Sequence, residues 1–161
     1  MNTSFQRSFR FASADETTAF AAQIAPALSA GDVLLLQGDL GAGKTHFARG
    51  IVQTRLALAG LVEDIPSPTF TLVQTYDAGD VEIWHTDLYR LSSVDEIFEL
   101  GLIEAFDTAI CLVEWPDRLA EETPEGALTL HFAMTDQPGE RVLEASSTDT
   151  RWADILVSPN G

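Results

Sequence analysis

Residues 32–45 read DVLLLQGDLGAGKT, which places an apolar run, a glycine-rich segment and a basic residue in direct succession. The apolar run at Asp32–Gln37 is continuous rather than alternating. This predicts a short strand that is buried on both faces near the centre of a sheet. The residues from Lys44 to about Ala59, with Gly60 after them, predict a helix. The segment therefore predicts a buried strand, a tight loop and a helix.

The loop between strand and helix matches the pattern G-x-x-x-x-G-K-[ST] in full. Its members are Gly38, Asp39, Leu40, Gly41, Ala42, Gly43, Lys44 and Thr45. Glycines allow backbone angles that are closed to residues with a Cβ, so successive N–H groups can turn toward one anion. The helix N-terminus directs unpaired N–H groups at the same place. We therefore expect a phosphate-binding loop for ATP, with Lys44 on the β and γ phosphates and the Thr45 hydroxyl on Mg²⁺.

Charge and composition narrow the class of protein. The chain has 161 residues, of which 45% are hydrophobic, and a formal net charge of −16. Its length fits one domain over residues 1–161, and its charge argues against direct binding of nucleic acid. No apolar run predicts a membrane span or a signal peptide, and Cys111 is the only cysteine, so we expect a cytoplasmic protein. Lys44 is the only lysine, at the one motif position that needs an ammonium group.

Acidic side chains follow two further predicted strands. Glu114 comes directly after the apolar run Ala109–Val113, and Asp87 ends the strand predicted at Val81–Thr86. A phosphate loop needs a carboxylate at the end of a neighbouring strand on the metal side. Either acid could hold Mg²⁺, directly or through water, while the other orients the attacking water. Each could also be an ordinary surface acid at a strand end.

A proline-rich loop is predicted at Glu63–Thr69. Thr69 could sense the γ-phosphate there and complete the ligands of the metal, or it could belong to an ordinary proline turn. The candidate catalytic residues are thus Lys44, Thr69, Asp87 and Glu114, and the candidate metal ligands are Thr45 and Glu114.

The remaining segments predict an α/β fold. The expected strands are Ser4–Phe11 at an edge, a hairpin of Phe70–Asp77 and Val81–Thr86, and a hairpin of Ala127–Met134 and Arg141–Ser146. The expected helices run from a capping box at Ser13–Glu16 to about Leu28, from a second box at Ser93–Glu96 to Leu100, onward past Gly101 to about Phe106, and over Pro116–Glu122. The last ten residues have no assigned structure. Together these elements predict a three-layer P-loop NTPase-like domain with a mixed parallel and antiparallel central sheet.

Four motifs in order carry a resemblance to a known family. They are GDLGAGKT at 38–45, SPTFTLV at 67–73, HTDLYRL at 85–91 and LVEWP at 112–116. Over about residues 5–147 the chain resembles the TsaE family, also called YjeE, the bacterial ATPases of tRNA threonylcarbamoyladenosine biosynthesis. The resemblance implies weak intrinsic ATP hydrolysis and the partners TsaD and TsaB. It also implies threonylcarbamoyl transfer to adenosine 37 of tRNAs reading codons that begin with A, with tRNA contacted only through the complex.

The resemblance also implies roles for single residues. Thr45 and Glu114 would contact the metal, Thr69 lies in the switch-like segment, and Asp87 lies in the segment associated with hydrolysis. His46, which joins the nucleotide-binding set, stands where the family often has Thr or Ser, so that imidazole would replace a hydroxyl at the α-phosphate.

Several other side chains keep two interpretations. Trp115 would lie near the nucleotide or in the core, and Arg141 would reach the base or ribose or form an ion pair at the rim. Tyr89 and Arg90 would dock the partner or brace the switch. The histidines His85 and His131 are expected to be structural, with His85 making hydrogen bonds.

Three other functions are weighed against this one. A P-loop small-molecule kinase usually brings several arginines from a lid, whereas the eight arginines here are scattered; a screen of phosphate acceptors would separate the two. A GTPase is excluded, because its N-K-x-D segment needs a lysine other than Lys44. A non-enzymatic assembly module gated by ATP would still work with a Glu114→Ala variant that binds ATP without turnover. No obvious arginine finger stands in the motifs, so we expect slow intrinsic turnover that a partner accelerates.

Overall fold

The structure, a computed structural model, describes residues 4–39, 41–61, 73–89 and 94–156. The strands are β1 (Phe5–Phe11), β2 (Val33–Gly38), β3 (Val73–Asp77), β4 (Glu82–Asp87), β5 (Ile110–Glu114), β6 (Leu128–Met134) and β7 (Arg141–Ser147). The helices are α1 (Ala14–Ile24), α2 (Lys44–Leu58), α3 (Val94–Leu100), α4 (Leu102–Thr108) and α5 (Trp152–Ile155), with 3-10 turns η1 (Ala25–Ala27) and η2 (Pro116–Glu122). The expected order of elements is confirmed within these ranges.

The strands form one mixed sheet in the order β1-β7-β6-β2-β5-β4-β3. The central strand β2 runs parallel to both β5 and β6, and β4 runs parallel to β5. The remaining pairs, β1–β7, β6–β7 and β3–β4, are antiparallel. The predicted edge position of β1, the central position of the apolar run and both hairpins are therefore correct.

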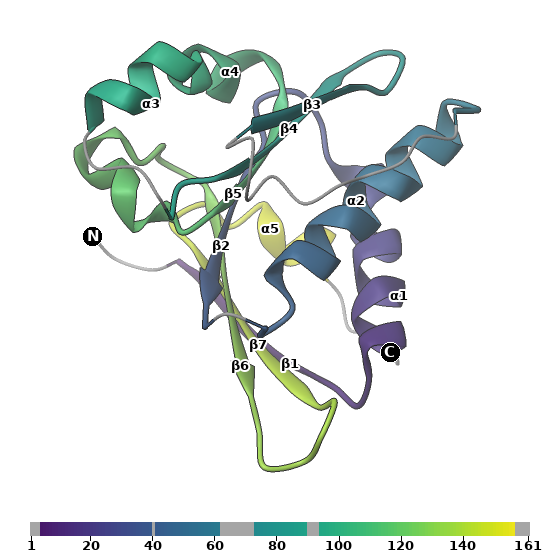
Figure 1. Cartoon of the computed structure of the whole chain (residues 1–161). Helices are drawn as coiled ribbons and strands as arrows, with labels where there is room; N and C mark the ends of the chain where they lie inside the picture. Colours follow the sequence, from purple (N-terminus) through teal and green to yellow (C-terminus); the bar gives the residue numbers. More distant parts are fainter. Residues whose placement is uncertain (1–3, 40, 62–72, 90–93, 157–161) are drawn as a thin grey trace.

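Helices cover the two faces of the sheet, as Figure 1 shows. Alternate residues of β2 point to opposite faces: Leu34 and Leu36 join the core under α1, α2 and α5, whereas Val33 and Leu35 join the core under α3, α4 and η2. A strand that buries both faces needs apolar residues at every position, which explains the continuous run. The three-layer α/β arrangement is thus confirmed.

The start of α1 follows the predicted capping signal. The Ser13 hydroxyl accepts from the backbone N–H of Glu16, and the Glu16 carboxylate accepts from the backbone N–H of Ala12 rather than from that of Ser13. The end of the helix differs from the prediction, since α1 stops at Ile24 and a 3-10 turn follows instead of an α-helix to Leu28. Pro26 lies in that turn and has no N–H to continue the helix.

The C-terminal segment contains a helix that the sequence did not predict. Trp152 in α5 is fully buried, and its indole N–H donates to the carbonyl of Gly126 at 2.9 Å. Arg7 of β1 donates to the carbonyls of Ala153 and Leu156. A helix of four residues shows too little periodicity to be predicted from sequence. It is also too short to be stable alone, so its contacts with distant residues hold it in place.

Glycine at position 50 lets α1 and α2 pack closely. A Cβ placed on Gly50 would lie 2.9 Å from the Cβ of Ala21, closer than side chains tolerate. We expect Gly50→Ala to lower the free energy of unfolding by about 1 kcal/mol, because overpacking outweighs the better helix propensity of alanine. Urea denaturation measures this loss. The double variant Ala21→Gly with Gly50→Ala restores the space, so a coupling energy near zero between the two changes would contradict this packing.

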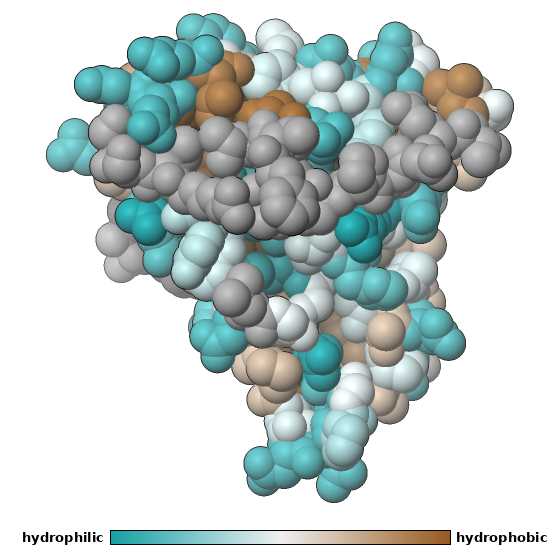
Figure 2. All heavy atoms as spheres, viewed as in Figure 1, coloured by the Kyte–Doolittle hydropathy of each residue, from teal (hydrophilic) through white to brown (hydrophobic). Residues whose placement is uncertain are grey.

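The surface carries a few exposed apolar side chains. Leu58 and Leu61 lie at and beyond the end of α2, and Phe98 lies on α3. Figure 2, viewed as in Figure 1, shows patches of hydrophobic surface near the top of the molecule. The tapering lower end, where Figure 1 draws the β6–β7 hairpin, is mostly hydrophilic. Within the described ranges, no helix combines the length and apolar character needed to cross a membrane.

Candidate functional site

The glycine-rich loop joins the end of β2 to the start of α2 (Figure 1). Gly38, Gly41 and Gly43 have φ values of 136°, 81° and 108°, a region that favours glycine. Apart from adjacent parts of the chain, no atom of the described residues lies within 4 Å of where a Cβ of Gly41 or Gly43 would stand, so space is open there. Gly43 is the N-cap of α2 and offers no side-chain cap, so the first N–H groups of the helix have no side-chain acceptor there. The predicted glycine geometry is confirmed, and it suits an anion.

Lys44 is folded back against its own loop. Its Nζ donates to the carbonyl of Gly38 at 2.6 Å and lies 3.6 Å from the centre of the Trp115 ring. Only 4% of the residue is exposed. Burial lowers the pKa of Lys44 below its ordinary value, while nearby carboxylates, Glu114 and Asp87 foremost, oppose that shift. The ammonium group is therefore poorly hydrated, and an incoming phosphate would be a better partner for it than water.

Glu114 sits beside the loop because β5 is the parallel neighbour of β2. The Thr45 hydroxyl lies 2.8 and 3.0 Å from the two carboxylate oxygens of Glu114 and donates to them. On its other side Glu114 Oε2 lies 2.6 Å from His85 Nε2. Glu114 and His85 are both buried. The Thr45 hydroxyl and the Glu114 carboxylate therefore lie together at the start of α2. Mg²⁺ is commonly held by one or two such protein oxygens together with substrate phosphates.

Asp87 lies next to Glu114 in the sheet. The two residues are register partners at the carboxyl ends of the parallel strands β4 and β5. Asp87 is 6% exposed, and its Oδ1 accepts from the backbone N–H of Tyr89 at 2.9 Å. The two candidate acids therefore meet at one edge of the sheet, although they are far apart in sequence.

A cavity of about 320 Å³ connects these groups. It is lined by Gly41, Gly43, Lys44, Thr45, His46, Arg49, Asp87, Glu114 and Trp115. Gly38 and Asp39 instead line a neighbouring cavity of about 220 Å³, which Trp115 and the exposed His131 share. The methyl group of Ala42 is buried in the core, so this residue could contribute only its backbone. The candidates Leu40 and Thr69, together with Arg90, lie outside the described residues.

Trp115 forms one wall of the site. Its backbone adopts a left-handed conformation, with φ of 59° and ψ of 56°, which is rare for a bulky side chain. Its ring packs against Tyr89 with centroids 4.8 Å apart and covers the Lys44 ammonium. Strained backbone of this kind concentrates at functional sites. Of the two interpretations offered for Trp115, the cavity wall fits this half-buried ring better than the core.

Two other predicted residues contact neighbouring elements. His46 Nε2 lies 2.5 Å from the Thr18 hydroxyl and 3.1 Å from the carbonyl of Ala14, which brings the start of α1 beside the loop. Arg141 donates to the carbonyl of Gly41 at 3.1 Å and to that of Glu140 at 2.9 Å. The expected rim ion pair of Arg141 is therefore wrong in the described part of the chain, where backbone carbonyls take its place.

Sequence reasoning missed Arg49, which lines the main cavity from α2. A usable signal was present, because Arg49 follows Thr45 by four residues and so shares its helical face. The structural prediction for His85 is correct, since its hydrogen bond holds the carboxylate of Glu114.

The contact of His85 with Glu114 leads to a prediction. We expect His85→Leu to raise the Mg²⁺ concentration needed for nucleotide binding by about tenfold, because groups that orient a metal ligand affect metal affinity by 10–100-fold. His85→Gln, whose amide can still donate to Glu114, should recover part of the loss. Magnesium titrations at a fixed nucleotide concentration measure this. Identical magnesium dependence of parent and His85→Leu would contradict the role of His85.

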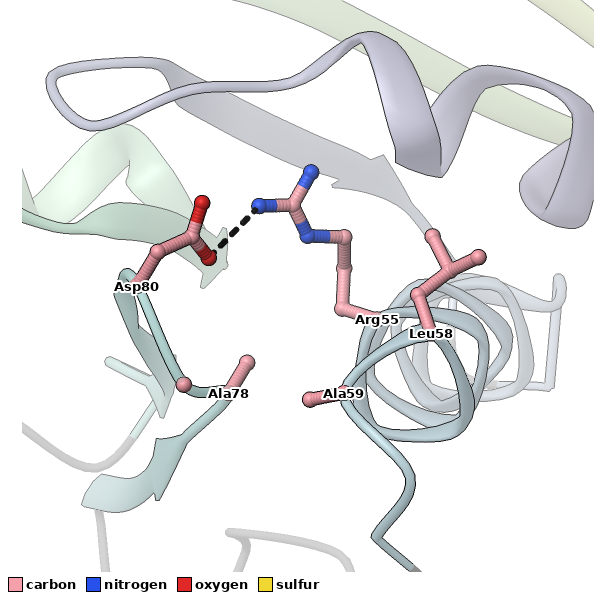
Figure 3. Close-up of a pocket in the computed structure, with 6 residues that line it drawn as sticks. Arg55, Leu58, Ala59, Ala78 and Asp80 are labelled. Atoms are coloured by element: carbon pink, nitrogen blue, oxygen red, sulfur yellow. Dashed lines mark ion pairs between the residues drawn. The ribbon is translucent and has the colours of Figure 1, made fainter.

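Another cavity lies at the opposite end of α2, as Figure 3 shows. Its volume is about 420 Å³, and Arg55 faces Asp80 across it at 3.7 Å. Arg55 also donates to the carbonyls of Ala25 and Leu28. These contacts join α2 to the end of α1 and to the β3–β4 turn, so this cavity is a junction between elements rather than part of the loop site.

Comparisons with known proteins agree with this geometry. A family model described as threonylcarbamoyl adenosine biosynthesis protein TsaE matches residues 11–143. Proteins named tRNA threonylcarbamoyladenosine biosynthesis protein TsaE are similar. The one from Treponema pallidum is 40% identical over 123 residues, covering 76% of this chain and 87% of the relative. The one from Bacillus subtilis is 39% identical over 126 residues, covering 78% and 76%.

A third relative of the same name, from Rickettsia conorii, is 47% identical over 105 residues. That match covers 65% of this chain and 58% of the relative, so a considerable part of the relative lies outside it. Among solved structures, the crystal structure of YdiB from Bacillus subtilis is similar, with a TM-score of 0.72 and 30% identity. It covers 96% of this chain and 93% of that chain.

Proposed function

The chain belongs to the TsaE family of threonylcarbamoyl adenosine biosynthesis proteins, and from this premise we propose that it binds ATP with Mg²⁺ at the Gly38–Thr45 loop and hydrolyses it slowly. The role of the family lies in the biosynthesis of tRNA threonylcarbamoyladenosine. The proposal extends to the partners TsaD and TsaB, which the protein would support in modifying adenosine 37 of tRNAs that read codons beginning with A.

One observation carries the proposal. The sole lysine, the Thr45 hydroxyl and the Glu114 carboxylate converge on a loop whose glycine faces are open and whose helix start is uncapped by any side chain. Open N–H groups and a lysine suit a triphosphate tail, and the paired oxygens of Thr45 and Glu114 suit Mg²⁺. This set of donors and acceptors explains why the loop has glycine where it does.

The residues of the site divide the work of hydrolysis. The loop amides and Lys44 would bind the phosphates and neutralise the negative charge that grows on the γ-phosphate. Thr45 and Glu114 would hold Mg²⁺, which supplies further neutralising charge when bound. Asp87, beside Glu114 and at the edge of the same cavity, would accept a hydrogen bond from the attacking water and orient it. The ring of Trp115 would keep water away from the Lys44 ammonium.

Slow turnover and dependence on partners are the parts of the proposal that kinetics can test. Purified protein should bind ATP in calorimetry with Mg²⁺ present and should hydrolyse it far below the roughly 1–100 per second of kinases. Addition of TsaD and TsaB should raise that rate, and a pull-down in the presence of ATP should recover both. Absence of ATP binding by folded protein supplied with its partners would refute the proposal, and fast hydrolysis by the isolated protein would refute its dependence on partners.

Glu114→Gln is the sharpest variant for the chemistry. Glutamine keeps the shape of the side chain and can still meet Thr45 and His85, whereas alanine would leave the buried His85 without its partner. We expect hydrolysis to fall at least about 100-fold, because the metal loses its charged protein ligand. Single-turnover assays measure the rate, and circular dichroism checks the fold. Parent-like turnover in this variant would place the metal ligand elsewhere.

A further inference from the structure

Arg49 stands on α2 one turn after Thr45 and lines the cavity of about 320 Å³ beside the phosphate loop. Residues four apart on an α-helix share a face, and helical side chains lean toward the N-terminus of the helix. The long side chain of Arg49 therefore extends back along α2 toward the turn that carries Thr45.

The guanidinium group of Arg49 lacks an acceptor for one buried donor. Its Nε atom is buried and has no hydrogen-bond partner among the residues that the structure describes. Buried N–H groups are almost always paired, because an unpaired one has lost its water without compensation. A charged donor left in this state at the edge of a cavity can accept a ligand anion as its partner.

The other arginines in the described ranges are all paired, in contrast to Arg49. Each donates to a carboxylate or to a backbone carbonyl, and they are Arg7, Arg10, Arg55, Arg118, Arg141 and Arg151. Arg55, on the same helix, faces Asp80 in Figure 3. The contrast is informative because the chain carries 25 acidic residues and only nine basic ones, so that acceptors are plentiful.

The two carboxylates that line the cavity with Arg49 have other partners. Glu114 accepts from Thr45 and lies within hydrogen-bond distance of His85. Asp87 accepts from the backbone of Tyr89. Neither acid forms an ion pair with Arg49 among the described contacts, although both line the same cavity. The cavity thus holds a cation that is available for an anion entering from solvent.

With the proposed function supplying the ligand, we infer that Arg49 binds the outermost phosphate of the bound nucleoside triphosphate. Lys44 approaches the phosphate tail from the loop, and Arg49 approaches from the next turn of α2. Thr45 and Glu114 mark the side where the metal and the terminal phosphate belong. A forked guanidinium can hold two phosphate oxygens at once, which a point-like ammonium cannot. Arg49 is therefore the residue that distinguishes a triphosphate from a diphosphate.

Calorimetric titrations of the full chain with Mg-ATP and Mg-ADP test this assignment. Arg49→Gln should weaken ATP binding by about 10–100-fold, because one charge-assisted contact is lost. ADP binding should stay within about twofold of the parent, since ADP ends before the contact. Arg10→Gln is the matched control: it removes the same charge from an exposed ion pair that does not line the cavity, and it should change neither affinity. The melting temperature of Arg49→Gln should stay close to that of the parent, because no described contact is lost.

Equal weakening of ATP and ADP by Arg49→Gln, or no weakening of ATP, would overturn the inference. If Arg49→Gln does not fold, Arg49→Lys decides: this variant keeps the charge without the fork, and an ATP-to-ADP affinity ratio equal to that of the parent would overturn the assignment. Failure of the parent protein to bind ATP would refute the proposed function itself, which is a different result from any difference between variants.

Discussion

Lys44→Met is expected to abolish measurable nucleotide binding while leaving the protein as stable as the parent. The ammonium group sits between the Gly38 carbonyl at 2.6 Å and the face of Trp115 at 3.6 Å, at the mouth of the open loop. Two charge-assisted phosphate contacts amount to roughly 3 kcal/mol or more, so we expect at least about 100-fold weaker binding of ATP. Calorimetry with Mg-ATP measures the loss.

Arginine should not replace Lys44. A guanidinium group is wider than an ammonium group and cannot occupy the narrow space between Gly38 and Trp115 without displacing one of them. Lys44→Arg should therefore bind ATP as poorly as Lys44→Met, although it keeps the positive charge. Parent-like affinity of Lys44→Arg would show that charge alone, and not the geometry of this contact, is what the loop requires.

The stability of Lys44→Met follows from the pKa of the lysine. Burial lowers the pKa of Lys44 in the folded protein below its ordinary value of 10.5. Between these two pKa values the unfolded chain binds more protons than the folded chain, so this group makes stability rise as the pH increases through that window. Lys44→Met lacks the rise and avoids burying a charge, so its free energy of unfolding at neutral pH should stay within about 1 kcal/mol of the parent. Urea denaturation of both proteins across that alkaline window measures the difference.

Gly38→Ala is expected to cause the largest loss of stability among the loop variants. Gly38 has φ of 136°, and a Cβ there would lie 2.4 Å from the carbonyl oxygen of Phe132. Phe132 is the register partner of Gly38 on β6, and β2 is held between β6 and β5, so neither backbone can retreat. Backbone strain and overpacking together should lower the free energy of unfolding by roughly 3–5 kcal/mol. A thermal melt should show a decrease of about 10 °C.

Gly41→Ala is the matched control for this effect. Gly41 also has a positive φ, of 81°, but beyond its chain neighbours no described atom lies within 4 Å of its Cβ position. Only the backbone strain of about 1–2 kcal/mol remains, so Gly41→Ala should melt much closer to the parent. It should nevertheless weaken ATP binding, because the new methyl group points into the open space over the loop. Equal losses of stability in Gly38→Ala and Gly41→Ala would contradict the contact with Phe132.

The glycine-rich loop of the candidate site could be predicted from sequence, because its backbone angles depend on the residues of the loop itself. Glycines at 38, 41 and 43 predict backbone angles that other residues avoid, and all three have a positive φ in the structure. The pairing of Asp87 with Glu114 was predictable only as two strand ends, because parallel strands bring their carboxyl ends to one edge whatever their distance in sequence. The partners of His46 and Arg141 could not be read from sequence, since they depend on how α1 and the β6–β7 hairpin approach the loop.

The buried central strand, the glycine-rich loop and the helix after it could be predicted from the sequence alone, because an apolar run, glycine spacing and a helix start are properties of neighbouring residues. Other features depend on how the folded chain packs: His85 holds Glu114, Trp115 covers Lys44, and Trp152 anchors the last helix. Packing also leaves the buried Nε of Arg49 without a hydrogen-bond partner among the described residues. The three contacts join residues that are 26 to 71 positions apart in the sequence, so no local pattern connects them. Their energies come from burial and from hydrogen bonds made after the chain has folded.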